Sequence, residues 1–387
     1  MSAPQGAPEA PRRAAAFDTV DLREIDLNIT NRCNLACTHC AFASDAGDAT
    51  ELPKDVIGQI VEDAKALGCR EIHLSGGEPT LHRKFEEVLA TMLASGIFVR
   101  LISNGTMPAA RLAGYRDMGL RHILISIDGL EATHDRIRGC AGGYRTAMAR
   151  VHQAVAAGYE VRLNGVAMQD NLEDLLALFE VAEASRVAVF SIFLYSPTGR
   201  NAAGQLNRIV GPLQWRAFKS ALRERCKGSR TRVFVERGFL FPDDDTGGWQ
   251  PPSGRGGGCH SLGSVLDYVI ITAAGEVFPC ALLTDKATAF GNVFQRRLSD
   301  IVRQPDDGLE GYRHLREPSP PCVGCCEWRR CHGGCRALVW ATHHCWELPD
   351  PACARGSSGP PPFIPLCRLL KEDLQSSSSS GFSEVLS

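Results

Sequence analysis

Short apolar runs alternate with longer amphipathic segments between Glu24 and Tyr195. Apolar runs of about four to eight residues are typical of buried strands, and apolar positions recurring with the helical period are typical of helices. The strands predicted in this way are Glu24–Ile29, Glu71–Ser75, Phe98–Ile102, His122–Ile127, Glu160–Val166 and Val187–Leu194. The predicted helices are Lys54–Leu67, Lys84–Ser95, Ala110–Met118, Thr146–Ala157 and Leu172–Ala184. Strands that alternate with helices form parallel sheets, so the sequence predicts an α/β fold.

Glycines follow several of the predicted helices. Gly68, Gly96, Gly119 and Gly158 each stand where the chain must leave a helix and begin the next strand. Glycine adopts the left-handed conformation that ends many helices without a steric penalty. A closed eight-stranded barrel takes about 250 residues. We therefore expect an open, partial (β/α)6 barrel of the TIM type over residues 23–197.

The pattern changes after the barrel segment. Residues 198–258 are interpreted as a linking region with one helix, Leu213–Cys226, and a loop rich in Gly and Pro. Residues 259–370 combine many cysteines with sparse periodicity, so we expect a metal-dependent domain with little regular structure. Residues 1–22, rich in Ala and Pro, and the Ser-rich residues 371–387 are both expected to be disordered.

Composition narrows the range of partners. The chain has 387 residues, is 44% hydrophobic and carries a formal net charge of −2. It can therefore bury a large core, and it offers no general attraction to nucleic acid or to an anionic membrane. The sequence contains neither an apolar run of the roughly 20 residues that a spanning helix needs nor a secretion signal. We expect a cytoplasmic protein that binds neither nucleic acid nor a membrane.

Sixteen cysteines are the most informative feature of the composition. A reducing cytoplasm disfavours disulfides, and clustered thiols there are more often metal ligands. Cys33, Cys37 and Cys40 stand in CX3CX2C spacing directly after the first predicted strand, where the active groups of β/α barrels lie. Ordinary electron-transfer [4Fe–4S] clusters have four cysteine ligands, so three thiolates leave one iron open. A zinc loop short of one ligand, or simple buried thiols, are the alternatives.

Polar and glycine-rich turns follow the next three predicted strands. They are Gly76–Pro79 after the second strand, Ser103–Gly105 after the third and Ser126–Gly129 after the fourth. Adjacent glycines allow the backbone to approach a ligand closely. Because these turns follow successive strands, we expect them to share one rim of the barrel with the cysteine loop.

CX3CX2C after the first strand together with Gly-Gly-Glu-Pro after the second resembles the radical S-adenosylmethionine (SAM) superfamily, over residues 24 to about 195. The resemblance implies that Cys33, Cys37 and Cys40 bind a [4Fe–4S] cluster whose fourth iron is chelated by SAM. The residues that it places around SAM are Gly76, Gly77, Glu78, Pro79, Ser126, Asp128 and Arg138.

The implied roles of these residues differ. The Gly76–Pro79 turn would hold the SAM amino group, Ser126 and Asp128 would contact ribose or carboxylate, and Arg138 would pair with the carboxylate. For the last three residues, a cap or a solvated side chain is the alternative. His39 stands where the family often has an aromatic residue near adenine, and we do not interpret it as a metal ligand or a base.

Seven more cysteines form a second pattern in the C-terminal part of the chain: Cys259, Cys280, Cys322, Cys325, Cys331, Cys335 and Cys353. Two close pairs alone would suit zinc, but seven cysteines downstream of a radical-type cluster favour iron–sulfur clusters. Their spacing, with Gly275 between the first two, resembles the SPASM extension of radical SAM enzymes, which carries auxiliary [4Fe–4S] clusters.

The resemblance divides these cysteines between two auxiliary clusters. One set is Cys322, Cys325, Cys331 and Cys353, and the other is Cys259, Cys280 and Cys335, with its fourth ligand left open. Cys345 and Cys367 are the alternatives to Cys353, which we prefer because of its Asp-Pro context. The other cysteines outside the patterns are interpreted as buried or incidental thiols. Among them, Cys140 and Cys326 lie close to predicted sites.

By this resemblance the chain is an enzyme of lyase or oxidoreductase type. It would cleave SAM reductively to a 5′-deoxyadenosyl radical and abstract hydrogen from a biosynthetic intermediate, with electrons from a donor such as flavodoxin or ferredoxin. A non-catalytic iron–sulfur carrier is the alternative from another class, but a carrier needs no SAM pocket such as Gly-Gly-Glu-Pro implies. An RNA-methylating enzyme would need a basic patch that the sequence lacks.

The substrate is the most open part of the interpretation. About 23 residues precede the first strand, too few for the leader-binding domain of many peptide maturases. This favours a small-molecule natural product of sugar, nucleoside or tetrapyrrole type. The run Ser196–Arg200 resembles both heme-pathway decarboxylases and mycofactocin-type enzymes. We expect a radical decarboxylation, with maturation of a ribosomally made peptide as the alternative.

Overall fold

In the computed structural model, most of the chain up to residue 306 is described, together with shorter pieces near its end. The described residues are 19–200, 206–235, 265–306, 322–325, 328, 333–346, 348, 350, 351 and 353. Cys259, Cys326, Cys331 and Cys367 lie outside these residues, as do most of the predicted leader and the whole predicted tail.

One curved sheet forms the centre of the described part of the chain, in the order β10-β9-β8-β1-β2-β3-β4-β5-β6-β7. The strands are β1 Thr19–Asn28, β2 Glu71–Ser75, β3 Phe98–Ser103, β4 His122–Ser126, β5 Glu160–Ala167, β6 Val189–Leu194, β7 Arg232–Val235, β8 Val265–Ile271, β9 Glu276–Phe278 and β10 Gly291–Asn292. From β8 to β7 every neighbouring pair is parallel, whereas β9 runs antiparallel to β8 and to β10.

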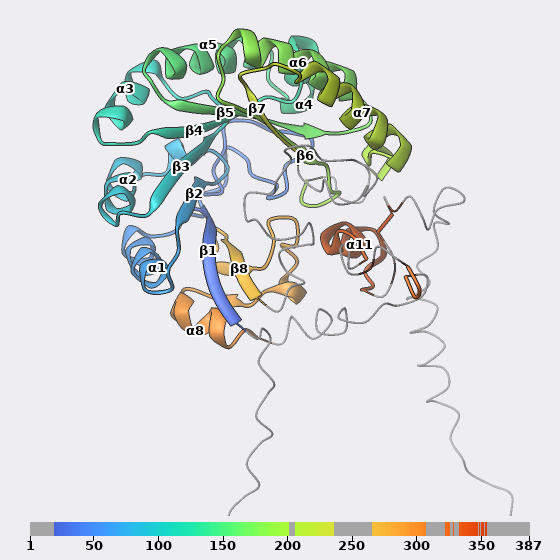
Figure 1. The fold of residues 1–387 in the computed structure, drawn as a ribbon. Helices are drawn as coiled ribbons and strands as arrows, with labels where there is room; N and C mark the ends of the chain where they lie inside the picture. The colour runs from blue at the N-terminus through green and yellow to red at the C-terminus, as the bar shows by residue number, and fades with distance from the viewer. Residues whose placement is uncertain are drawn as a thin grey trace, which may run out of the picture.

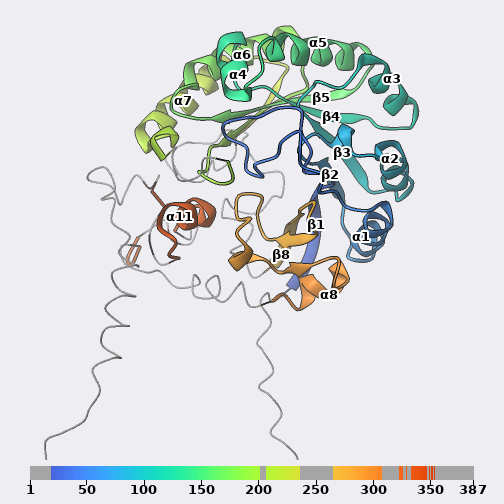
Figure 2. The same ribbon diagram turned by 180° about the vertical axis from the view of Figure 1, so that it is seen from behind.

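Helices cover the outer side of this sheet. They are α1 Lys54–Ala66, α2 Phe85–Ala94, α3 Ala109–Asp117, α4 Glu131–Arg138, α5 Gly143–Ala156, α6 Leu172–Ala184 and α7 Pro212–Arg225, followed by α8 Leu298–Arg303 and α11 Arg336–His343. Figure 1 shows α1, α2, α3, α5, α6 and α7 as an outer arc around the strands. The view from behind shows β8, α8 and α11 on the open side of that arc (Figure 2).

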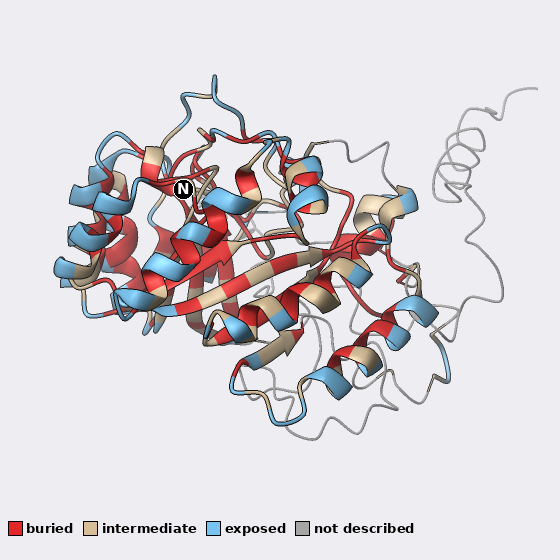
Figure 3. Cartoon of the chain, turned by 90° about the horizontal axis from the view of Figure 1, so that it is seen from above, coloured by how far each residue is buried: buried red, intermediate tan, exposed pale blue. Residues whose placement is uncertain are grey.

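The core lies between the outer face of the sheet and the inner faces of these helices. In α1, Ile57, Ile60, Val61 and Ala64 recur with the helical period and are buried against the strands, as expected of an amphipathic surface helix. Figure 3 shows this alternation as buried inner faces and exposed outer faces of the same helices. The apolar pattern of the sequence thus explains why each helix lies flat against the sheet.

The predicted partial barrel is confirmed. β2 and α6 have the predicted ends, and each of the other predicted strands and helices differs by a few residues at one end or at both. Gly68, Gly96, Gly119 and Gly158 all have positive φ angles, between 77° and 110°, so each ends its helix in the conformation that favours glycine.

The sheet crosses the predicted domain boundaries at both edges. β7, from the predicted linking region 198–258, pairs with β6, and β8, from the predicted cysteine-rich domain 259–370, pairs with β1. The regular elements in the described residues after 259 are the short strands β8, β9 and β10 and the short helices α8 and α11. The run Val265–Ile271 is almost wholly apolar, and β8 and β9 are joined by a tight turn at Gly275, whose φ is 81°.

Helix α4 was not predicted because most of its residues are polar. Among its eight residues only His134, Ile137 and Arg138 are buried, so it has no continuous apolar stripe to mark it. No helix in the described residues is long and apolar enough to cross a membrane.

Candidate functional site

The loop after β1 carries the first group of cysteines. Cys33 and Cys37 are buried around Leu35, and Cys40 and Cys140 pack against them. The three cysteines of the CX3CX2C motif are therefore brought together at the carboxyl end of the sheet. Cys140 joins them because α4 ends at Arg138, directly before Gly139 and Cys140.

The turn after β2 holds the beginning of this loop. The backbone N–H of Gly77 donates to the carbonyl of Thr30 at 2.7 Å, and that of Glu78 donates to the carbonyl of Arg32 at 2.9 Å. A Cβ on Gly76 would stand 2.6 Å from the Thr30 oxygen, and one on Gly77 would stand 2.5 Å from the Arg32 oxygen. Both glycines are thus required for the close approach of two backbones, in addition to any approach to a ligand.

Glu78 joins the same turn to the end of β3. Its fully buried carboxylate accepts hydrogen bonds from the Ser103 hydroxyl at 3.0 Å, the Thr80 hydroxyl at 2.7 Å and the Asn104 backbone N–H at 2.8 Å. Burial raises the pKa of Glu78, and these donors oppose that shift. The Asn104 side chain in turn donates to the Cys33 sulfur at 3.8 Å, so the β3 turn also contacts the cysteine loop.

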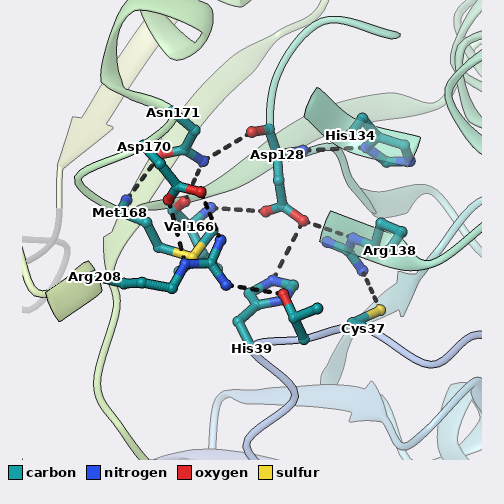
Figure 4. Close-up of polar contacts among 11 residues, drawn as sticks. Cys37, His39, Asp128, His134, Arg138, Val166, Met168, Asp170, Asn171 and Arg208 are labelled. Carbon is teal, nitrogen blue, oxygen red and sulfur yellow. Dashed lines mark hydrogen bonds and ion pairs between the residues drawn. The ribbon is translucent and has the colours of Figure 1, made fainter. Parts of the chain in front are cut away.

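A second ionic group lies beside Cys37, between β4 and α4. Figure 4 shows the Asp128 carboxylate between His39 and Arg138, with Cys37 on the far side of Arg138. Asp128 Oδ2 lies 2.6 Å from Arg138 Nε and 3.3 Å from His39 Nε2. A guanidinium nitrogen of Arg138 donates to the Cys37 sulfur at 3.8 Å. Two residues that the sequence singled out, Asp128 and Arg138, therefore bind each other.

The position of Asp128 is fixed by its neighbours. It is fully buried, its other carboxylate oxygen accepts the Val166 N–H at 3.0 Å, and its backbone carbonyl accepts the Asn171 side chain at 2.8 Å. Burial alone would raise the pKa of Asp128, but Arg138 and His39 hold it well below its usual value. His134 accepts the Asp128 backbone N–H, and burial together with Arg138 lowers the pKa of His134 to about 4. Asp128 is thus charged and His134 neutral at pH 7.

The other residues expected around SAM lie on the same rim. Pro79 begins a short 3-10 turn, Pro79–Leu81, and is buried. Ser126 ends β4, is half-buried and stands opposite Asn164 of β5. The structure places Gly76, Gly77, Glu78, Pro79, Ser126, Asp128 and Arg138 at the carboxyl ends of β2 and β4 or in α4.

The chemistry of this rim suits an iron–sulfur cluster with SAM. Burial raises the pKa of Cys33 to about 12, and it also raises the pKa of Cys37, against the effect of Arg138. Buried thiols of this kind become thiolates when a metal displaces their protons. Two buried polar atoms, Asn28 Oδ1 and His39 Nδ1, find no partner among the described residues. Such atoms are rare unless a ligand or water satisfies them.

The C-terminal cysteines gather in a separate place. Cys322 lies near Cys325 and Cys353, and burial raises the pKa of the Cys322 thiol, with a further contribution from these two neighbours. Cys335 caps the start of α11, and its sulfur accepts the Leu338 N–H at 3.4 Å. The predicted ligands Cys259 and Cys331 lie outside the described residues.

Asp350 connects two of these cysteines. Its carboxylate accepts the Cys335 N–H at 2.6 Å, and its backbone carbonyl accepts the Cys353 N–H at 2.9 Å. Cys280 follows β9, and its sulfur accepts the Leu282 N–H at 3.4 Å. Asp350 thus links a described cysteine of one predicted auxiliary set, Cys353, to one of the other set, Cys335.

Sequence reasoning missed several polar residues of this rim. Arg208 donates to the Thr38 hydroxyl at 2.9 Å and pairs with Asp170. Together with Arg136, Gln169 and Asn207 these two residues line a pocket of about 430 Å³. Only tertiary structure places Arg208 beside a loop 170 residues earlier, so no local signal could have identified it.

Comparisons with known proteins agree on the family. A model described as the Radical SAM superfamily matches residues 27–182, and a model described as an iron–sulfur cluster-binding domain, SPASM, matches residues 259–332. The AdoMet-dependent heme synthase of Methanosarcina barkeri is 28% identical over 86% of this chain and 96% of its own length. The PqqA peptide cyclase of Rhodopseudomonas palustris is 28% identical over 85% of each chain.

Solved structures show the same fold. Streptococcus suis SuiB bound to S-adenosylmethionine matches with a TM-score of 0.68 at 18% identity, over 87% of this chain and 79% of that one. The native anSMEcpe with bound AdoMet matches with a TM-score of 0.63 at 15% identity, over 92% of this chain and 97% of that one.

Proposed function

Because this chain is a radical SAM enzyme with a C-terminal SPASM domain, we propose that Cys33, Cys37 and Cys40 hold the cluster that binds SAM. Its cofactors are [4Fe–4S] clusters and SAM. The observation that carries the assignment is the convergence of the three cysteines at one rim, beside the Gly76–Glu78 turn and the Asp128–Arg138 pair.

The residues around the loop have distinct proposed roles. When bound, the cluster and SAM supply a 5′-deoxyadenosyl radical that removes hydrogen from the substrate. The Gly76–Pro79 turn holds the amino group of SAM, and Ser126 contacts its ribose or carboxylate. Asp128 orients Arg138 toward the SAM carboxylate. This role is supported by the buried contact between Asp128 and Arg138, which leaves other guanidinium donors of Arg138 for a ligand.

Loss of any one of the three cysteines tests this assignment. Cys33→Ala, Cys37→Ala or Cys40→Ala should abolish formation of 5′-deoxyadenosine from SAM in the reduced enzyme, because the cluster that delivers the electron loses a ligand. Cys69→Ala is the matched control, since Cys69 is buried in the main core, away from this loop. Full SAM cleavage by any of the three variants would refute the assignment.

For the net reaction we propose a radical decarboxylation of a small-molecule biosynthetic intermediate. The supporting observation is the similarity to the AdoMet-dependent heme synthase, which covers 96% of that relative. The auxiliary clusters, held by Cys322, Cys325, Cys331 and Cys353 and by Cys259, Cys280 and Cys335, would then accept the electron left on the substrate. Electrons for SAM cleavage would come from a carrier of the flavodoxin or ferredoxin class.

Maturation of a ribosomally made peptide is the second candidate. It is favoured by several relatives named PqqA peptide cyclase, each 28% or 29% identical to this chain. The two candidate reactions can be distinguished by measuring which product forms in step with 5′-deoxyadenosine. Release of carbon dioxide in step with 5′-deoxyadenosine from a carboxylated small molecule supports decarboxylation. A peptide that gains a crosslink and loses two hydrogens, without carbon dioxide, supports maturation.

A further inference from the structure

The turn that follows Cys40 is strained. Ala43 has a φ of 51°, in the left-handed region that residues with a Cβ avoid. Its N–H donates to the Cys40 carbonyl at 3.3 Å, which closes a tight turn between Cys40 and Ala43. Strain of this kind persists only where neighbouring contacts hold the backbone in place.

Arg200 supplies contacts on both sides of that turn. Its backbone N–H donates to the Cys40 carbonyl at 2.9 Å. Its guanidinium donates to the carbonyl of Ser44, which is itself buried. One residue from the exit of β6 thus binds the first carbonyl of the strained turn and the carbonyl that follows it, that of Ser44, which is 156 residues away in the sequence.

Gly199 makes this approach possible. It has a φ of 65°, and a Cβ at this position would stand 2.2 Å from the Ala41 oxygen and 2.4 Å from the Cys40 oxygen. Both obstacles are backbone atoms that cannot rotate away. Any other residue here would therefore push the exit of β6 and the cysteine loop apart.

The three cysteines differ in how they are held. The Cys33 N–H donates to the Asp45 carbonyl at 2.9 Å, and Asn104 contacts its sulfur, while Arg138 contacts the sulfur of Cys37. Cys33 and Cys37 are buried, whereas Cys40 is only partly buried. Among the described residues, Arg200 supplies the contact that reaches the Cys40 backbone from outside the loop, whereas the neighbouring His39 and Ser44 contact Asp128 and Asn31.

We propose that Gly199 and Arg200 form a latch that fixes the position of Cys40, and with it the position of the cluster that Cys40 would help to hold. Both are positioning residues, since they act through the Cys40 loop. The proposal rests on Cys40 being a cluster ligand, as proposed above. It also makes the exit of β6 part of the cluster site, so that any displacement of this strand end moves Cys40.

The test measures hydrogen exchange in the reconstituted full-length enzyme. In Arg200→Ala, amide exchange between Cys40 and Ser44 should rise about tenfold, because the turn loses the side-chain bond that offsets its strain. Exchange at Thr30–Arg32, held by the β2 turn, should not change. Arg232→Ala removes an exposed arginine that pairs with Glu160 on the other end of the sheet, and it should leave both segments unchanged.

Gly199→Ala should increase exchange at the same segment by a larger factor. Its matched control is Gly228→Ala, since Gly228 has a φ of 77° and nothing within 4 Å of its would-be Cβ. Both variants strain the backbone, but only Gly199→Ala displaces the cysteine loop. Equal exchange at Cys40–Ser44 in the two glycine variants, or unchanged exchange in Arg200→Ala, would overturn the proposal.

A second substitution keeps the proposal testable if Arg200→Ala loses its cluster. Ala43→Gly removes the strain that the latch offsets, so Arg200→Ala with Ala43→Gly should regain iron and slow exchange. Failure of this rescue would contradict the latch. In Arg200→Ala that keeps its iron, the change in the cluster's EPR spectrum on adding SAM should differ from that of the parent enzyme, and an identical change would count against the proposal.

These outcomes remain separate from those of the proposed function. Hydrogen exchange reports the backbone whether or not Cys40 binds iron. If Cys40→Ala kept full SAM cleavage, the ligand assignment would fail while the exchange result could still stand. If Cys40→Ala abolished cleavage and Arg200→Ala left exchange unchanged, only the latch would fail.

Discussion

The two cysteine regions of this enzyme are held in different ways. The Cys33–Cys40 loop is fixed by the sheet, through the β2 and β3 turns, the end of α4 and the exit of β6. The described cysteines from Cys322 onward lie on short segments, which Asp350 and the buried Arg336 help to join. We therefore expect the first site to keep its shape without iron, and the second to depend more on iron for its order, as in small metal-folded domains.

Removal of iron should produce the largest difference in hydrogen-exchange protection between the two cysteine regions. After anaerobic chelation, hydrogen exchange around Cys322–Cys325 and Cys335–Cys353 should approach the unprotected rate, because metal binding contributes most of the local folding free energy there. The strands β1 to β6 should keep their protection. Equal loss of protection in both regions would contradict the comparison, and equal retention would show that the C-terminal segments fold without metal.

Cys325→Ala narrows the comparison to one cluster. We expect this variant to lose about four iron atoms, since a four-cysteine site loses a ligand, while SAM cleavage at the first site continues. Product formation should fall sharply, because the substrate loses its electron acceptor or its bound geometry. Iron content, 5′-deoxyadenosine and product should be measured on one soluble preparation. Full iron content with full product would show that Cys325 is no ligand.

Asp128→Asn tests the first site without touching a cysteine. Removal of the buried charge releases Arg138, so we expect SAM cleavage to slow by about ten- to a hundredfold, with unchanged iron content. Asp170→Asn is the matched control, because Asp170 also forms ion pairs with arginine but is partly exposed. A similar effect of both substitutions would indicate a general loss of charge rather than the orientation of Arg138.

The smallest expected effect is a dependence of the protein's stability on pH, caused by His73 in the sheet. Burial alone would lower the pKa of His73, but Asp26, Glu71 and Glu24 raise it from 6.5 to about 10. The stability from this ionic group is therefore complete below about pH 6.5 and is lost as pH rises toward 10. Thermal unfolding should show a decrease of several degrees over that range, and His73→Gln should lack it. A decrease of the same size in His73→Gln would exclude His73 as its cause.

The sequence predicted the local structure well because local structure follows local pattern. The alternation of apolar and polar residues fixes β2 and α6, and the glycines after the helices mark where each one ends. Turns at successive strand ends share a rim in any parallel sheet, so the gathering of Cys33 and Gly76 followed from topology. The cysteine spacing together with the Gly76–Pro79 turn was sufficient to identify the family.

Long-range pairing could not be predicted in the same way. Nothing near Arg200 in the sequence shows that it binds the Cys40 turn, and the ion pair of Asp128 with Arg138 depends on how α4 packs. β8 was missed because its apolar run lies among cysteines and glycines. Its partner strand β1 is also far away in the sequence: Asp26 of β1 and Tyr268 of β8, which form a hydrogen bond, are 242 residues apart. These contacts depend on tertiary packing, for which a single sequence gives no direct signal.

The pairing of β8 with β1 has a consequence for the chain as a whole. β1 would be an edge strand without β8, and an exposed apolar edge invites pairing with other molecules. A fragment that stopped before Val265 would leave the backbone donors and acceptors of β1 uncovered, next to the cysteine loop. The C-terminal region therefore covers an edge of the barrel that would otherwise be open to pairing with other molecules.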